Sequence, residues 1–451
     1  MKNPFKNSLL NIFSGFDTSR HFLVKRSKNK APAAHEPADE GMQAMPQGDE
    51  GELFIHQAMA RLEASAAFGA MVIRPDTADP DDSGGKADDL PERVRETARV
   101  VDGVCSENQG VWGLVDSATI GCYFNEINDA DCLALSRRIQ EKILQRKHSS
   151  VSIGMAVFPM SDFNRRDIME NARKALDHAD FLGPNSAVLF DAVSLNISGD
   201  RAYQKGDVAG AVKEFQSALK LDAENINVLN SLGVCYGAQG ALAEALQSFE
   251  SVMALDADHV MAHYNAGYVC TLLGRNDQAM QYFLKADGIG EAVYEVAFQI
   301  GKLYLEMANP ASAKTFLQKA LLINPDAAVT HFHLGECFKA LGETDQAVSH
   351  YETAVKKNPN DAAALSALGA LYDAKGENPE ISTLFCEKSV EISPDNGMFR
   401  YRLGTVYANN DMPEKALDAF ESAVRLGHDA ALEMEQTREL LAYGQRKRVS
   451  N

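Results

Sequence analysis

The chain has 451 residues, of which 45% are hydrophobic and 24% are charged, and its formal net charge is -19 at pH 7. This length predicts two or three domains, and the composition excludes a wholly disordered protein. The acidic balance argues against a nucleic-acid-binding surface, so we expect no nucleic-acid partner. No stretch approaches the 18 consecutive apolar residues typical of a membrane-spanning helix.

The seven cysteines are scattered, odd in number and never spaced as Cys-x-x-Cys. This pattern indicates reduced, mostly buried thiols in a cytoplasmic protein, and neither a zinc site nor a disulfide framework. Met1 is followed by Lys2, Asn3 and Pro4 without an apolar stretch, so we expect no signal peptide.

Residues 1–30 contain seven Lys and Arg residues and only one Asp, together with several Phe and Leu residues. Such a segment suits an anionic membrane surface, with the protein peripheral to the inner membrane, or the groove of a partner. The alternative interpretation is a disordered tail with incidental aromatic residues. Residues 31–50 carry five acidic and no basic residues among Ala, Pro and Gly, which is typical of a flexible linker.

Residues 51–191 alternate helical and strand patterns and are expected to form one domain. We predict helices at 52–66, 90–106, 129–146 and 166–181, with strands at 68–73, 151–158 and 186–190 and a strand pair over 111–124. Mixed strands and helices in a segment of this length predict an α/β sandwich with a single sheet.

Residues 192–430 repeat themselves. Seven glycines recur at spacings of 34, 34, 34, 34, 34 and 35 residues, at Gly199, Gly233, Gly267, Gly301, Gly335, Gly369 and Gly404. A small residue usually follows twelve positions later, and an aromatic or large apolar residue follows four positions after that. This pattern resembles the tetratricopeptide repeat (TPR), a helix–turn–helix of 34 residues. The resemblance implies an all-α solenoid of seven units in which the glycine and the small residue let two helices approach closely.

The sixth unit departs from the repeat, because it carries one extra residue at 376–379 and has Ser382, Cys386 and Ser389 at the usual Ala, Phe and Ala positions. We expect looser packing there. Residues 431–451 are expected to form a capping helix and a tail, with polar residues such as Glu435 and Glu439 on the outer face.

The resemblance to TPR proteins implies a concave groove lined by the first helix of each unit. Positions three before and one after the glycine face this groove in the family, and they hold a run of aromatic residues in the central units. The predicted peptide-binding residues are Tyr264, Tyr268, Phe298, Lys302, Phe332, Lys339 and Tyr401. They suit a protein or peptide partner with apolar anchors. The alternative is that the aromatic side chains pack against neighbouring helices as core.

The α/β segment resembles the GGDEF domain of diguanylate cyclases. Residues 150–159 (SVSIGMAVFP) resemble one strand of that family, and residues 167–191 resemble its last helix and strand. The resemblance implies a bacterial signalling protein. It also implies acidic metal ligands and a Gly-Gly turn, which this chain lacks: Gly113-Leu-Val-Asp-Ser117 replaces the signature, and Arg74-Pro75 follows the first strand.

Phosphoryl transfer without metal ligands and without the phosphate-binding turn loses the electrostatics that drive it. We therefore predict no catalytic residues, no cofactor and no metal in a degenerate, inactive GGDEF-like domain. The expected function is a non-catalytic interaction scaffold. The alternative is a sensor of GTP or cyclic di-GMP, or a weak diguanylate cyclase.

Overall fold

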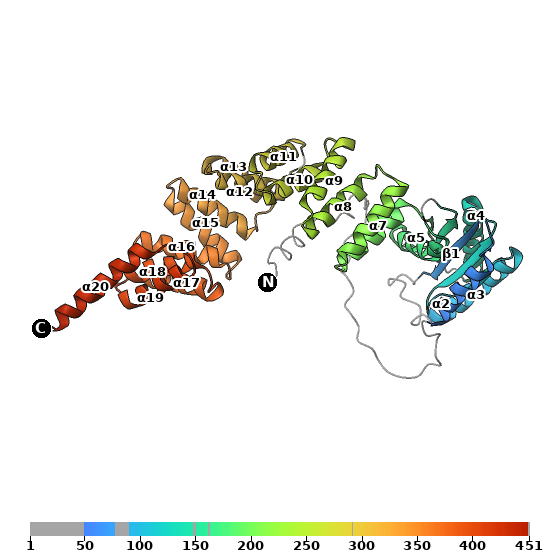
Figure 1. Ribbon diagram of the computed structural model, residues 1–451, viewed down its shortest axis with the longest axis horizontal. Helices are drawn as coiled ribbons and strands as arrows, with labels where there is room; N and C mark the ends of the chain where they lie inside the picture. Colours follow the sequence, from blue (N-terminus) through green and yellow to red (C-terminus); the bar gives the residue numbers. More distant parts are fainter. Residues whose placement is uncertain (1–48, 77–89, 148–149, 161–162, 291, 450–451) are drawn as a thin grey trace. The chain divides into compact units, whose positions relative to one another are not determined.

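The computed structural model describes residues 49–76, 90–147, 150–160, 163–290 and 292–449 (Figure 1). The chain forms two compact units, Met1–Ala257 and Asp258–Asn451. The predicted basic tail and nearly all of the acidic linker lie outside the described residues, as do residues 77–89.

The first unit begins with an α/β part whose elements follow the predicted order. They are α2 (Asp49–Arg61), β1 (Phe68–Pro75), α3 (Leu90–Glu107), β2 (Val111–Leu114), β3 (Ile120–Asn125), α4 (Asp129–Lys147), β4 (Val151–Phe158), the 3-10 turn η2 (Arg165–Asp167), α5 (Ile168–Leu182) and β5 (Ala187–Leu189). The sheet has the order β2-β3-β1-β4-β5. All neighbouring strands are antiparallel except β4 and β5, which are parallel.

The central strand β1 is buried on both faces of the sheet. Ala70 and Val72 point to a cluster that includes residues of α2 and α5, whereas Met71 and Ile73 point to a cluster with α3 and α4. Side chains alternate between the faces of a strand, so a continuous apolar run is what a strand covered on both sides requires. The predicted α/β sandwich with one sheet is confirmed.

The rest of the chain is helical. Its helices are α6 (Ala192–Gln204), α7 (Val208–Leu221), α8 (Ile226–Gln239), α9 (Leu242–Leu255), α10 (Val260–Leu272), α11 (Asn276–Gly288), α12 (Tyr294–Glu306), α13 (Pro310–Ile323), α14 (Ala328–Ala340), α15 (Thr344–Lys357), α16 (Ala362–Ala374), α17 (Pro379–Ile392), α18 (Gly397–Asn409), α19 (Pro413–Arg425) and α20 (Ala431–Val449). From α6 to α19 they pair as seven successive hairpins, as the repeat predicts.

The recurring glycine lies where the two helices of a hairpin meet. A Cβ atom at Gly233 would lie 2.6 Å from the ring of Phe249, and one at Gly267 would lie 2.7 Å from the ring of Phe283. The same close approach recurs in the other hairpins. Only a residue without a Cβ fits this contact, which explains the strict period of the glycines.

The two helices of the sixth hairpin, α16 and α17, pack closely although the side chains between them are small. Ser382, Cys386 and Ser389 are fully buried. The Ser382 hydroxyl donates to the Pro379 carbonyl at 2.9 Å, and the Ser389 hydroxyl donates to the Cys386 carbonyl at 2.8 Å. The expected loosening is therefore not seen at these positions. The extra residue is taken up in the turn, where Asn378 adopts a left-handed conformation with φ 48°.

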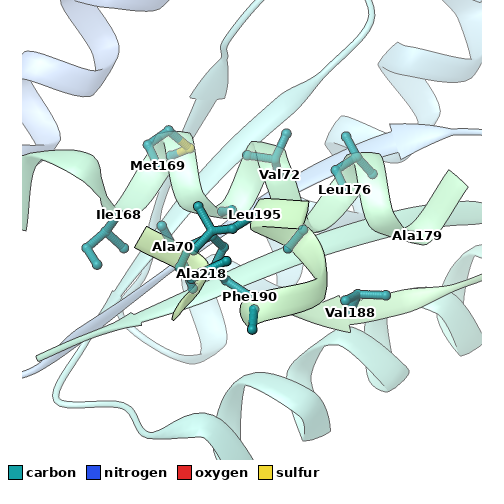
Figure 2. Packing of buried hydrophobic residues seen from close by; sticks show 14 of the residues in the cluster. Ala70, Val72, Ile168, Met169, Leu176, Ala179, Val188, Phe190, Leu195 and Ala218 are labelled. Carbon is teal, nitrogen blue, oxygen red and sulfur yellow. The ribbon is translucent and has the colours of Figure 1, made fainter. Parts of the chain in front are cut away.

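Within the first unit, the α/β part and the first hairpins share one hydrophobic core. Leu195 of α6 and Ala218 of α7 belong to the same cluster as Ile168 of α5 and Phe190 (Figure 2). An ion pair between Lys174 Nζ and Glu214 Oε1, at 2.8 Å, joins α5 to α7. The α/β part thus covers the first face of the repeat array, which would otherwise expose its apolar side chains.

Candidate functional site

The candidate site is an aromatic cluster on α12 and α14 in the second unit. Phe298 stacks on Tyr294 with centroids 5.8 Å apart and meets His333 edge to face at 5.4 Å. Phe332 also meets His333 edge to face, with centroids 5.3 Å apart, and packs on Tyr351 at 5.9 Å. Phe298 and Phe332 are only partly buried, so each ring rests on the core and keeps an open side. We call Tyr294, Phe298, Phe332 and His333 the aromatic cluster.

His333 is held in its neutral form at the centre of this cluster. Burial disfavours the imidazolium, and nearby Lys302 adds to this effect, whereas Glu336 and Asp361 oppose it. Together these effects lower the pKa of His333 to about 4. A neutral imidazole between two phenyl rings adds flat, weakly polar surface without a charge at pH 7.

Two lysines lie on the helices that carry the aromatic cluster. Lys302, one turn after Phe298 on α12, is half-exposed and pairs with Glu306 at 3.7 Å, an i,i+4 contact that contributes little in water. Lys339 is exposed near the end of α14. Glu336 is already engaged, because the Tyr351 hydroxyl donates to its carboxylate. Lys302, which lies close enough to His333 to affect its pKa, can therefore offer charge to a ligand beside the apolar surface.

Tyr264 does not belong to an exposed surface. It is 2% exposed and packs on Phe283 at 5.9 Å, so it is a core residue of its hairpin. The expectation of an exposed aromatic side chain at this position is wrong, because the ring fills the space between α10 and α11. Tyr268 is half-buried one turn further along α10.

Tyr401 lies apart from the aromatic cluster. Its hydroxyl donates to Glu433 Oε1 of α20 at 3.0 Å, and its ring lies 4.8 Å from that of His428. These contacts make Tyr401 an anchor for the last helix. The structure thus brings together Phe298, Lys302 and Phe332 from the predicted set and places Tyr401 in a different environment.

Two members of the aromatic cluster were missed from the sequence. Tyr294 precedes Phe298 by four residues, a spacing that places both on one face of a helix and could have identified it. Its hydroxyl hydrogen-bonds to Thr330 Oγ1 at 2.8 Å, which ties α12 to α14. His333 follows Phe332 directly, but a single histidine beside an aromatic residue forms no pattern that identifies a site from the sequence. Among the described residues no group of three metal-binding side chains occurs.

In the α/β part, the carboxylates nearest the expected catalytic positions have structural partners. Asp116 accepts hydrogen bonds from the backbone amides of Ala118 and Thr119, each at 2.9 Å, and so caps the β2–β3 hairpin. Gly113 leaves room for the ring of Phe54, since a Cβ there would lie 2.6 Å from it.

The end of β1 is likewise occupied by structural contacts. Asp76 accepts from the hydroxyls of Ser150 and Ser152, both at 2.6 Å, and from the Asn185 amide at 2.7 Å. Arg74 forms an ion pair with Asp180 of α5. These bonds hold the strand ends together and occupy the carboxylate of Asp76, which would have to be free in order to bind a metal ion with its phosphate ligand.

All seven cysteines are buried and free of disulfides, as predicted. Burial raises the pKa of Cys386 to about 12 and that of Cys235 to about 12, so neither thiol is a nucleophile near neutral pH. In the described part of the chain, no helix is both long and apolar enough to cross a bilayer.

Comparison with known families agrees with the hairpin geometry. Models of the tetratricopeptide repeat match residues 199–240, 262–289 and 304–372. The helical hairpins within these residues are tetratricopeptide repeats. No curated protein sequence matches the chain.

Several solved TPR structures resemble the array in fold. The structure of YrrB, titled a TPR protein with an unusual peptide-binding site, is 23% identical, with 41% of this chain and 95% of that chain covered and a TM-score of 0.37. A TPR protein from Parabacteroides merdae is 20% identical over 55% of this chain and 98% of its own, with a TM-score of 0.42. The structure of MamA from Desulfovibrio magneticus is 22% identical, with 38% of this chain and 96% of that chain covered and a TM-score of 0.34.

Proposed function

We propose that this protein is a non-catalytic scaffold that binds a segment of a partner protein through the first helices of its central TPR units. The observation that carries the proposal is the pair Phe298 and Phe332, two partly open rings held side by side around the neutral His333. Flat aromatic surface that is already ordered is a good anchor site, because little side-chain entropy is lost when a ligand covers it.

The partner segment that suits this surface carries apolar anchors with a carboxylate nearby. The anchors would cover the open sides of Phe298 and Phe332, and the carboxylate would meet Lys302 or Lys339. The ion pair contributes mainly to specificity and to the rate of association, because both lysines are accessible to water. This chemistry favours an extended or helical peptide over a small polar metabolite.

We further propose that the α/β part is a degenerate GGDEF-like domain without catalytic activity. The carboxylates of Asp116, at the β2–β3 hairpin, and of Asp76, at the end of β1, support this, because each accepts three hydrogen bonds from its own domain. In this proposal the α/β part covers the start of the array and positions it.

A peptide-display selection against the full chain tests the scaffold proposal. Selected peptides should carry an aromatic or large aliphatic residue, and their affinity for the Phe298→Ala/Phe332→Ala double variant should fall by about 30-fold or more. Phe181→Ala is the matched control, since Phe181 is 51% exposed on α5 and lies in the other unit. Equal affinity of wild type and double variant would contradict the proposal.

Isothermal titration calorimetry with GTP and with cyclic di-GMP, each with Mg²⁺, tests the inactive-domain proposal. We expect no saturable heat with the full chain. Saturable binding that is lost in Asp116→Ala would overturn the proposal and favour a nucleotide sensor instead.

A further inference from the structure

The last helix, α20, exposes an apolar stripe on the side that faces away from the array. Leu432, Leu440 and Tyr443 are 66%, 65% and 67% exposed. They rank among the most exposed large apolar side chains of the described residues, and they lie within twelve positions of one helix. At 100° per residue, these three share one face with Gln436 between them. The expected polar outer face is thus only partly polar.

The opposite face of α20 is already used. Ala430 and Thr437 are buried, and Met434 packs on the cluster formed by α18 and α19. Two hydrogen bonds add to this packing. The Tyr401 hydroxyl of α18 donates to Glu433 of α20 at 3.0 Å, and Arg438 of α20 donates to Glu421 of α19 at 2.7 Å. The helix is therefore fixed in orientation, and the stripe of Leu432, Leu440 and Tyr443 is presented outward by a rigid support.

Charge along α20 is divided between its two halves. The first half carries Glu435 and Glu439, both exposed, beside the stripe. The second half carries the sequence Arg446-Lys447-Arg448. A second α20 running in the opposite direction would therefore bring basic residues beside acidic ones at both ends. A parallel partner would instead place like charges together, which is unfavourable at close range.

We propose that α20 is a self-association surface, on which two copies of this chain pair through antiparallel α20 helices with Leu440 near the two-fold axis. Such a contact is isologous, so one stripe serves both partners and the assembly closes as a dimer. The pair would present two peptide-binding arrays in one complex and raise avidity for a repeated partner.

The size of the surface sets the strength of the pairing. A helix of 19 residues is about 28 Å long, and one face of it supplies fewer residues than the roughly 20–30 per side of a standard interface. The dimer is therefore expected to be reversible, with a dissociation constant in the micromolar range.

Sedimentation velocity of the full chain, from about 1 µM to about 100 µM, measures the association directly. We expect a concentration-dependent shift from monomer to dimer, and Leu440→Glu should remain monomeric throughout. Leu322→Glu is the matched control, since Leu322 is 85% exposed on α13 outside the stripe, and it should dimerise like wild type. A wild-type chain that stays monomeric, or a dimer that Leu440→Glu leaves intact, would overturn the proposal.

Cysteine cross-linking tests the antiparallel direction, because all seven native thiols are buried. Leu440→Cys should form a disulfide-linked dimer under mild oxidation. Leu432→Cys should not, because the two introduced thiols would lie about 24 Å apart along the helices. Cross-linking of both variants would indicate parallel helices and overturn the antiparallel arrangement.

Discussion

The ring of Phe298 meets the imidazole of His333 edge to face, with centroids 5.4 Å apart and planes inclined by 62°. The contact joins α12 to α14 across two repeats, and the buried imidazole remains neutral because its pKa is lowered to about 4. The aromatic cluster is therefore both a structural contact between repeats and a partly open surface. Its integrity depends on the protonation state of one side chain.

Acidification should destabilise the array through His333. The folded-state pKa lies below the ordinary value of 6.5, so the unfolded chain binds more protons between pH 6.5 and pH 4. The contribution of the neutral imidazole is complete above pH 6.5 and is lost as the pH falls toward 4. His331 and His350 act in the same direction, since burial lowers the pKa of both.

Urea denaturation at pH 7 and pH 4.5, for wild type and His333→Gln, measures this contribution. Wild type should lose about 2 kcal/mol more of its unfolding free energy than the variant over this interval. The remaining loss, common to both proteins, reports His331, His350 and the carboxylates. Identical losses in the two proteins would show that His333 is not buried in its neutral form.

The turn of the fourth hairpin lacks the usual glycine and should gain stability when one is introduced. Ala308 has φ 56°, a left-handed conformation that costs an L-residue about 1 kcal/mol. Ala308→Gly removes this strain from the folded state. Glycine also increases the conformational entropy of the unfolded chain, which offsets part of the effect, so we expect a net stabilisation of about 0.5 kcal/mol.

Gly342→Ala is the reciprocal control, since Gly342 has φ 75° at the equivalent turn of the fifth hairpin. It should destabilise the array by about 1 kcal/mol. Thermal denaturation of both variants checks the pair, and changes of the same sign in the two would contradict the conformational explanation.

The shared core of the first unit predicts that the α/β part and the first repeats unfold together. Leu195→Ala, at a residue 1% exposed in this core, should cost about 3 kcal/mol and lower amide-exchange protection in both β4 and α8. Leu403→Ala, in the core around α18, is the control and should leave β4 protected. Loss of protection in α8 alone would mean that the α/β part is stable by itself.

Much of this fold follows from the sequence. The repeat period fixed the seven hairpins because Gly233, Gly267 and their equivalents occupy contacts that accept no Cβ atom. The alternating helical and strand patterns likewise predicted the strand at 151–158, which the structure has as β4 (Val151–Phe158). What a single sequence does not contain is the packing between repeats: Tyr264 and Phe298 occupy equivalent positions, yet the first is buried on Phe283 and the second stays partly open.

The apolar stripe of α20 is a second feature that the sequence alone does not determine. The spacing of Leu432, Leu440 and Tyr443 is visible in the sequence, but a stripe of this kind is equally typical of a buried face. Only the packing of Met434 and Thr437 on the array shows which side of α20 faces outward. Orientation of a terminal helix depends on its neighbours and not on its own periodicity.

The most direct test of the scaffold is the dissociation constant of a selected peptide for wild type and for Phe298→Ala/Phe332→Ala, measured by fluorescence anisotropy. Circular dichroism must first show that the double variant keeps its helical content. We predict that the dissociation constant rises by about 30-fold or more in the double variant and is unchanged in Phe181→Ala. An unchanged dissociation constant in a folded double variant would show that the aromatic cluster is core alone and that the partner binds elsewhere.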